Sequence, residues 1–371
     1  MSKSSSTPAP LNIKMTRTIH PVGQGAFYSE TFTDEDKQAF FTAVYDCGSQ
    51  NNKHLKRLIK DVKITANLLF ISHFHNDHTN GVLDLLSDQS KRCNIVIPGI
   101  THCRFVVDLI YIYTRTKSIG SPSIKFMLSC IPALKKPWST AGIVYADDNF
   151  PGIICKHPAS SVTYSVMAIS PTIGRPVPLF EPSIHWYYDA NYTEIDPSKE
   201  EQLIRELSVI LPSLETIMPD LEEYRDSDWY ERHLLSVITE DKLNDIGEIF
   251  TKVFGASHHN SYSMLVHSHP EMGRTDKRMN CLYTGDAEKR TVINAVNTSH
   301  PHYIQVPHHG SKRNYDVAIY SDYPIVFISV GKSFPYGHPS QTTLLGLIRL
   351  CQDIHITTED KGTRYKWLFT F

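Results

Sequence analysis

The stretch LLFISHFHNDHTNG, residues 68–81, constrains the fold more than any other part of the chain. Its apolar run over 68–71 is followed almost at once by four metal-ligand-type side chains, those of His73, His75, Asp77 and His78. A buried strand that delivers polar groups at its carboxyl end, followed by a helix from about Thr79, is typical of α/β sheets that build a site there. The stretch therefore predicts an α/β fold with a ligand site at this sheet edge.

The spacing of these side chains suits the coordination of two metal ions. Alternate residues of an extended strand share a face, so His73 and His75 can converge on one ion, while the turn brings Asp77 and His78 to a second. Imidazole nitrogens and carboxylate oxygens at about 2.0–2.2 Å are zinc ligands. Two such ions about 3.5–4 Å apart form a hydrolytic site. A solvated polar loop is the alternative, but three exposed histidines in six residues would serve no purpose in folding.

This H-x-H-x-D-H pattern behind a hydrophobic strand resembles the signature of the metallo-β-lactamase superfamily. The resemblance implies an α/β fold built as a four-layer αβ/βα sandwich, with two metal positions at one edge. It also implies that Asp46, at the end of FTAVYDCG, orients the metal loop through hydrogen bonds, and that Asp286 of the TGD motif bridges both ions. For Asp46, an ordinary turn aspartate before Gly48 is the alternative.

Four further motifs resemble the ComEC-like branch of this superfamily and occur in order along the chain. They are VGQG at 22–25, NSYS at 260–263, HHGS at 308–311 and YGHP at 336–339. Ordered agreement of this kind is more specific than any single motif. Only the block over 171–255 has no counterpart in the resemblance.

The resemblance implies further ligands from the later motifs. In the superfamily the third ligand of the first ion is usually a histidine four residues before the small residue that begins the next strand. Counting back four residues from Ser263 selects His259. His258 and Asn260 are the alternatives, and Asn260 matches the asparagine of the branch. His308 is preferred to His309 for the second ion, which would place His309 beside the scissile group. The predicted metal ligands are His73, His75, Asp77, His78, His259, Asp286 and His308, with Asp46 and Asn260 supporting them.

The same resemblance implies a mechanism in which two ions share a water and lower its pKa towards about 7, so that hydroxide attacks the substrate. Asp77 would orient this nucleophile. His338 would protonate a leaving oxygen or bind a phosphate, although it can equally cap the helix expected at 341–350. The serine of HHGS and the two basic residues that follow it would hold a phosphate, although the basic residues can equally form a solvated turn, and these three are Ser311, Lys312 and Arg313. The cofactors expected are two divalent metal ions, zinc in preference to manganese, and the ligand set also accepts iron.

The charge distribution is uneven and bears on the substrate. Residues 194–248 contain 16 acidic against 5 basic residues, a local charge of −11, which leaves +9 on the rest of the chain. A basic catalytic body suits an anionic substrate such as DNA or RNA, so a phosphodiesterase or nuclease is the leading interpretation. Hydrolysis of a small phosphodiester, a lactone or a thioester is one alternative. A non-catalytic subunit that binds a protein partner through the acidic block is another.

The remaining segments predict how the domain is organised. Alternating patterns over 15–46 predict a β-meander, and periodic apolar residues predict helices at 51–62 and 104–116. The block over 171–255 is expected to be a helical acidic insertion or lid, and the strands near 353–358 and 363–371 to close the second sheet. Residues 1–14 read as a disordered lead and not a signal peptide. Scattered cysteines without C-x-x-C pairs, and no apolar run of about 18 residues, predict a cytoplasmic protein without a membrane span.

Overall fold

The structure is a computed structural model of the whole chain. It describes residues 13–87, 89, 92–138, 144–146, 150–170, 177–181, 186–193, 197–216, 224–254, 262–271, 277–333 and 336–370.

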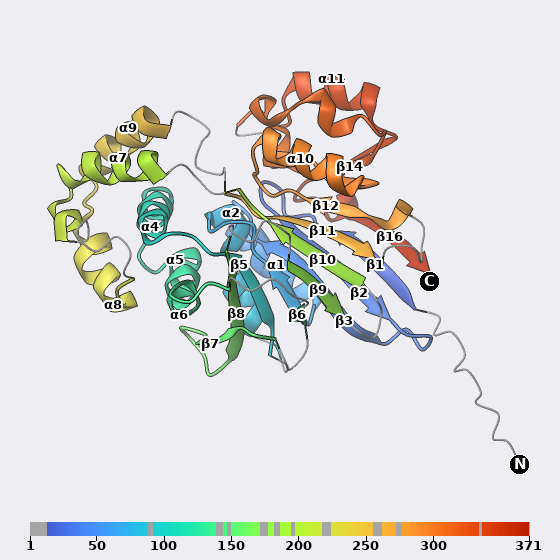
Figure 1. Cartoon of the computed structure of the whole chain (residues 1–371), viewed down its shortest axis with the longest axis horizontal. Helices are drawn as coiled ribbons and strands as arrows, with labels where there is room; N and C mark the ends of the chain where they lie inside the picture. The colour runs from blue at the N-terminus through green and yellow to red at the C-terminus, as the bar shows by residue number, and fades with distance from the viewer. Residues whose placement is uncertain are drawn as a thin grey trace, which may run out of the picture.

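Two mixed eight-stranded sheets form the framework (Figure 1). The first has the order β16-β1-β2-β3-β4-β5-β8-β7, and its strands are β1 (Lys14–Ile19), β2 (Phe27–Thr33), β3 (Ala39–Cys47), β4 (Leu68–Phe70), β5 (Asn94–Pro98), β7 (Ile153–Lys156), β8 (Thr163–Ile169) and β16 (Tyr365–Thr370). The second has the order β15-β14-β13-β12-β11-β10-β9-β6, and its strands are β6 (Val144–Tyr145), β9 (Val177–Glu181), β10 (Trp186–Asn191), β11 (Leu265–Pro270), β12 (Cys281–Tyr283), β13 (Tyr303–Gln305), β14 (Ile325–Ser329) and β15 (Asp353–Thr357).

The expected meander and parallel β-α-β units are present in the first sheet. β1, β2 and β3 pair antiparallel, and β3, β4 and β5 then run parallel with α1 (Asn52–Val62) between β3 and β4. The expectation that the C-terminal strand closes the second sheet is wrong, because β16 pairs antiparallel with β1 at the edge of the first sheet. The alternating pattern of this strand indicates a sheet edge but carries no information about which sheet it joins.

Aromatic side chains fill the space between the two sheets. Tyr28 of β2 packs against Tyr283 and Phe327 of the second sheet, with ring centroids 5.8 and 5.2 Å apart respectively. Phe70 of β4 packs against Tyr188 of β10 at 5.4 Å. Large buried rings contribute much of the stabilising apolar area in such a core. The sheets are therefore packed face to face around one core.

A buried polar network also crosses this core. Arg17 of β1 donates to Glu30 of β2 at 2.8 Å, and both side chains are fully buried. Glu30 also accepts hydrogen bonds from Ser268 at 2.6 Å and Tyr283 at 3.0 Å, both in the second sheet. Buried charges are tolerated when they are paired and hydrogen-bonded in this way.

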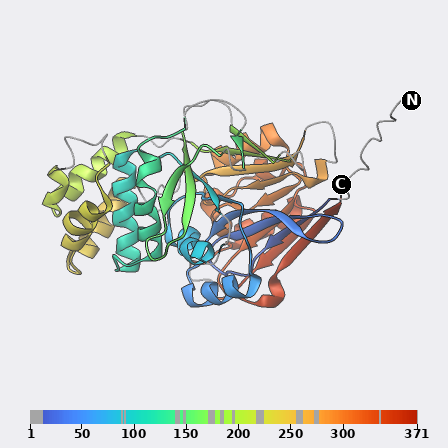
Figure 2. The same cartoon turned by 90° about the horizontal axis from the view of Figure 1, so that it is seen from below.

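Helices cover both outer sides of the paired sheets (Figures 1 and 2). Those connected with the first sheet are α1, α2 (Asn76–Thr79), α3 (Val82–Ser87), α4 (His102–Thr116), α5 (Pro122–Ser129) and α6 (Ile131–Leu134). On the second sheet, α10 (Lys289–Ser299) and α11 (Gln341–Leu350) bury Val292, Val296 and Leu347 against the strands. The arrangement is compatible with the αβ/βα sandwich predicted from the sequence.

The acidic block contains strands as well as helices. β9 and β10 fall within 171–255 but belong to the second sheet, so the helices start only at Pro197. The helical part consists of α7 (Pro197–Ser208), α8 (Ser227–Trp229), a π-helical turn over Tyr230–Leu234 and α9 (Lys242–Phe254). The alternation in WYYDAN is hidden in sequence because its outward positions carry tyrosine and aspartate. We call residues 197–254 the helical lobe, which packs on α4 at one end of the molecule (Figure 2).

The cysteines and the length and polarity of the helices bear on two expectations from the sequence, which concern disulfides and membrane spans. All seven cysteines are free, and six of them are buried. Among the described helices, not one is both long enough and apolar enough to cross a bilayer.

Candidate metal centre

The predicted ligands come from segments that are far apart in sequence and meet where the two sheets approach each other. Ser72, just after β4, accepts a backbone hydrogen bond from Met264 at 2.7 Å, which ties the first sheet to the start of β11. Asp286 follows β12, and its backbone N–H donates to the hydroxyl of Ser263 at 3.0 Å. The carboxyl ends of β4, β12 and β13 thus surround one site, as expected for α/β sheets.

The helix after the histidine motif begins earlier than the sequence predicted. α2 starts at Asn76 and not near Thr79, with His75 at the N-cap position. Asp77 and His78 are therefore helical residues. A carboxylate in the first turn is favoured there by the exposed backbone N–H groups of a helix start.

Asp46 is hydrogen-bonded to the metal loop on three sides. It accepts hydrogen bonds from the backbone N–H of Ser72 at 2.7 Å, from the hydroxyl of Ser72 at 2.7 Å and from Nδ1 of His78 at 2.8 Å. The Ser72 hydroxyl in turn accepts from Nδ1 of His73 at 2.9 Å. Asp46 is thus hydrogen-bonded directly to the ring of His78 and, through the hydroxyl of Ser72, to that of His73.

Three histidines share one arrangement, in which Nδ1 is anchored and Nε2 points inward. His73 and His78 are anchored as described above, and Nδ1 of His309 donates to the backbone carbonyl of Ser329 at 2.9 Å. The Nε2 atoms of all three are buried and have no hydrogen-bond partner among the residues that the structure describes. A ring whose Nδ1–H is bound to an oxygen presents a lone pair on Nε2, which is how histidine coordinates metal ions.

These Nε2 atoms converge on Asp286. They lie 3.9 Å (His73), 3.4 Å (His78) and 3.7 Å (His309) from its carboxylate oxygens, and His309 is also 3.7 Å from Asp77. Two overlapping groups result, His73 with His78 and Asp286, and Asp77 with His78 and His309, each with ligand atoms within 4.8 Å of one another. The geometry fits divalent metal ions, because ligand atoms around one ion at about 2.0–2.2 Å must approach one another this closely.

The backbone around the site adopts conformations that few residues favour. Asp46, His308 and His309 have φ values of 53°, 50° and 53°, in the left-handed region. Gly285, at φ 51°, packs so closely on Ser72 and Ser263 that a Cβ would lie 2.4 Å from the Ser263 hydroxyl. Such conformations cost about 1–3 kcal/mol each outside glycine and persist where the surroundings impose them, often at functional sites.

The charges at the site compensate one another in the absence of metal. Burial lowers the pKa of a histidine, but Asp286 and Asp46 outweigh it and raise the pKa of His78 well above its usual value. Burial would raise the pKa of Asp77, yet its interaction with His309 lowers that pKa to about 2. The pKa of His73 falls well below its usual value through burial and the neighbouring His78 and His75. Divalent ions would replace protons held between these rings and carboxylates.

The other predicted ligands lie at different distances from this cluster. The ring of His75 packs against that of Tyr111 in a tilted arrangement, with centroids 4.5 Å apart, and its centroid is also 4.5 Å from that of His73. His75 is in neither of the two tight groups. Nδ1 of His308 is 3.9 Å from Asp286, so both residues of the histidine pair face this carboxylate, while only His309 is grouped with Asp77 and His78. His258, His259 and Asn260 lie outside the described residues.

A cavity of about 490 Å³ opens onto the cluster, and several residues that line it were not predicted as site residues. They include Gln24, Gln50, Tyr111, Arg115 and Tyr336, beside His75, Asp77, Asp286, His308, His309 and His338. Arg115 lies over the Tyr111 ring, 5.4 Å from its centroid. These α4 residues carry no local signal, because a tyrosine and an arginine four positions apart are common on solvated helices. The described lining residues include none from the helical lobe.

The predicted substrate-binding residues are only partly at this cavity. His338 is half-buried, and its ring centroid is 6.0 Å from that of His308. Burial, together with His308 and His309, lowers its pKa to about 4, so it is neutral at pH 7. Ser311 is buried, whereas Lys312 and Arg313 are exposed and do not line the cavity. Among the described lining residues, the positive charge comes from Arg115.

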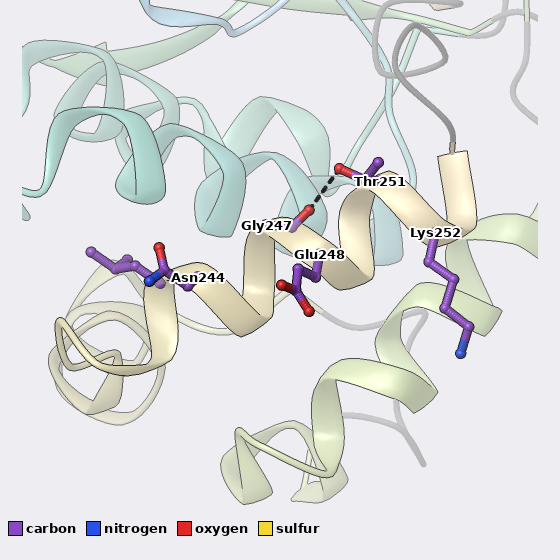
Figure 3. Close-up of a pocket in the computed structure, with 6 residues that line it drawn as sticks. Asn244, Gly247, Glu248, Thr251 and Lys252 are labelled. Atoms are coloured by element: carbon purple, nitrogen blue, oxygen red, sulfur yellow. Dashed lines mark hydrogen bonds between the residues drawn. The ribbon is translucent and has the colours of Figure 1, made fainter.

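A second, shallow hollow of about 600 Å³ lies on α9 (Figure 3). It is lined by Leu243, Asn244, Gly247, Glu248, Thr251 and Lys252. Lys252 forms an ion pair with Glu206 at 2.7 Å, and Thr251 donates to the carbonyl of Gly247. No group of metal-ligand-type side chains among the described residues lies there.

Comparisons with known proteins find similarity in structure and not in sequence. No protein-family model matches the chain, and no curated protein is significantly similar in sequence. The crystal structure of the metallo-β-lactamase MIM-1 from Novosphingobium pentaromativorans aligns with 78% of this chain and 76% of its own, at 11% identity and a TM-score of 0.29. The assignment of the site therefore depends on the geometry of this chain's own residues.

Proposed function

We propose that the protein is a metal-dependent hydrolase with a metallo-β-lactamase-type site, ComEC-like in its motifs, that cleaves phosphodiesters. The observation that carries the proposal is the convergence of three Nδ1-anchored histidines, His73, His78 and His309, on Asp286. Hydrogen-bond partners hold each ring so that its free nitrogen faces the shared carboxylate. This arrangement has little value for folding and is what a dinuclear site requires.

Two divalent ions, zinc in preference to manganese, would supply Lewis acidity and an activated water at this site. The chain's own residues would do the rest. Asp77, which holds its charge down to about pH 2, would orient the attacking water by accepting its hydrogen bond. His338, neutral at pH 7, would donate a hydrogen bond to a substrate oxygen and would not act as an imidazolium acid.

Arg115 supports an anionic substrate. Arg115 is an exposed residue whose guanidinium lies at the rim of the cavity, 5.4 Å from the centroid of the Tyr111 ring. An arginine fork suits phosphate oxygens. The basic charge of +9 outside the acidic segment supports DNA or RNA as substrate. The cavity of about 490 Å³ favours a short stretch of chain or a small diester as the part held in it.

The experiment is an activity assay of the zinc- or manganese-loaded protein against single- and double-stranded DNA, RNA, bis-p-nitrophenyl phosphate and a lactone. We expect cleavage of nucleic acid and of the small diester, with a loss of about 100-fold or more in Asp77→Ala. Arg115→Gln should raise KM for the diester by about 10-fold or more, the effect of losing a charged hydrogen bond.

Lys117→Gln is the matched control, because Lys117 caps the C-terminal end of α4 two residues beyond Arg115, does not line the cavity and pairs with Glu240. Lactone cleavage without diester cleavage would reject the phosphodiesterase. Absence of metal uptake would reject the hydrolase and favour a binding subunit. Cleavage of the small diester alone would replace the nuclease with a small-molecule phosphodiesterase. Binding of a protein partner by the acidic helical lobe stays a prediction.

A further inference from the structure

A second group of histidine and aspartate side chains lies on the β10–β11 pair, away from the candidate metal centre. Asp189, His267 and His269 each offer one ligand atom, and these atoms lie within 4.8 Å of one another. Asp189 is directly opposite His267 in the antiparallel register, and His269 is two residues further along β11. Because alternate residues of a strand face the same side, all three share one face of the sheet. Trp186 and Tyr188 face the core on the other side.

The hydrogen bonds of His269 fix which of its nitrogens carries the proton. Its Nδ1 lies 2.8 Å from the backbone carbonyl of Pro270, which can only accept, so Nδ1 is the donor. In the neutral ring, Nε2 then has a lone pair, and it lies 3.0 Å from the carboxylate of Asp189. Two acceptors at this distance require a cation between them, either a proton on Nε2 or a metal ion.

His267 distinguishes these two cations. His267 is about nine-tenths buried, and its Nε2 has no hydrogen-bond partner among the described residues. Its Nδ1 is 4.0 Å from the carboxylate of Asp189. The ring stacks on that of His269, with centroids 4.4 Å apart and planes at 22°. A proton on His269 would satisfy only its own pair with Asp189. A metal ion between these two side chains would also engage His267, whose Nδ1 lies 4.0 Å from the same carboxylate.

We propose that Asp189, His267 and His269 form a second site for a divalent metal ion, separate from the candidate metal centre. The carboxylate of Asp189 lies 3.0 Å from Nε2 of His269 and 4.0 Å from Nδ1 of His267. These distances lie on either side of the roughly 3.3 Å that separates neighbouring ligand atoms of a tetrahedral zinc ion. Two imidazoles and one carboxylate suit zinc, iron(II) or manganese and leave room for water. His267 and His269 lie four and six residues beyond Ser263, so they are about 13 and 20 Å further along the strand from the first centre.

The test uses the full-length protein with the first centre disabled by His78→Ala and Asp286→Ala. After equilibration with zinc and gel filtration, we expect this background protein to retain one equivalent of zinc by elemental analysis. Adding His267→Gln and His269→Gln should reduce the retained zinc to none. Adding His300→Gln instead should leave one equivalent, because His300 forms a surface pair with Asp322 but belongs to none of the groups of possible metal ligands among the described residues.

Two outcomes would overturn the proposal. The first is a background protein that retains no zinc and whose melting temperature does not rise with added zinc, a result that does not depend on the folding of the glutamine variants. The second is equal zinc content with and without His267→Gln and His269→Gln. In either case the His269 and Asp189 contact is an ordinary ion pair. Neither result bears on the hydrolase proposal, which depends on residues already altered in the background.

Discussion

Nδ1 of His78 donates to Asp46 at 2.8 Å, and the opposite nitrogen of the same ring lies 3.4 Å from Asp286. The His78 ring therefore lies between the buried carboxylate of Asp46 and the carboxylate of Asp286 at the candidate metal centre. Asp46 is itself fully buried and bound to Ser72 through two hydrogen bonds. The His78 ring can rotate away from the ligand position only by breaking its bond to this anchored group.

The first prediction is that Asp46→Asn weakens metal binding without unfolding the protein. Asparagine has the same shape and tolerates the left-handed φ of 53° at this position. Its amide can present N–H to Nδ1 of His78 and favour the wrong tautomer, so we expect a loss of about 10–100-fold in metal affinity. Competition with a zinc chelator measures this change. Ser49→Ala is a control on the same loop, and an unaltered affinity in Asp46→Asn would contradict the prediction.

The second prediction concerns the adjacent pair His308 and His309. The sequence favoured His308 as ligand, whereas the structure groups His309 with Asp77 and His78 and anchors its Nδ1 on Ser329. We expect His309→Gln to lose about one equivalent of metal and His308→Gln to retain both. Elemental analysis of the two variants, side by side with the wild type, measures this difference. The opposite result would support the original preference for His308.

The parts of the site that could be predicted are those encoded by local pattern. An apolar run that ends in H-x-H-x-D-H indicates a strand and a set of candidate metal ligands within six residues, and TGD after an apolar strand indicates Asp286 as a further candidate. Arg115 and Tyr111 could not be found this way, because they reach the cavity through the packing of α4 and not through any local motif. Asp189, His267 and His269 were missed for the same reason, since their strands lie about 80 residues apart.

The fold shows the same division between local and non-local information. Period-two alternation correctly indicated the strands of the meander. The partner of β16 is β1, almost a whole chain length away, and no local pattern encodes such a pairing. The sequence likewise placed β10 in a helical block, because tyrosine and aspartate on its outward positions masked the alternation.

The third prediction is that Asp108→Asn destabilises the protein by about 3 kcal/mol. Asp108 pairs with Arg104 at 2.8 Å in the same helix, both are fully buried, and Asp108 also accepts from the hydroxyl of Tyr262. Loss of one charge of a buried pair costs about 3–5 kcal/mol, because the remaining charge loses its closest partner. Glu200, 3.9 Å from Arg104, should offset part of this cost. Chemical denaturation measures the change.

The matched control is Asp228→Asn. Asp228 forms an i,i+4 pair with Arg232 at 3.5 Å, with the same spacing as the buried pair, but both side chains are exposed. Exposed pairs of this kind contribute about 0.3–0.5 kcal/mol. If the two variants lost similar stability, the buried pair would not have the role that we assign to it.

The fourth prediction is that His20 makes folding sensitive to acid. His20 is buried, stacks on Phe27 at 4.2 Å and bonds to Ser29 at 2.8 Å, and burial with the nearby Arg364 and Lys366 lowers its pKa to about 3. In the unfolded chain the ring takes up a proton near pH 6.5, which the folded protein binds only near pH 3. The contribution of neutral His20 to stability is therefore complete above about pH 6.5 and is lost progressively as the pH falls towards 3. Each unit of that interval costs at most about 1.4 kcal/mol.

His20→Gln removes this titration and leaves an amide that can still bond to Ser29. We expect the free energy of unfolding of the metal-free wild type to fall by several kcal/mol more than that of His20→Gln between pH 7 and pH 4. His233→Gln, at an exposed site in the helical lobe, should follow the wild type. Chelator-treated samples are needed because the binding of metal ions by histidine depends on pH and would add its own contribution to the profile. Parallel pH profiles of wild type and His20→Gln would mean that His20 accepts its proton without unfolding, through a rearrangement that lets water reach the ring.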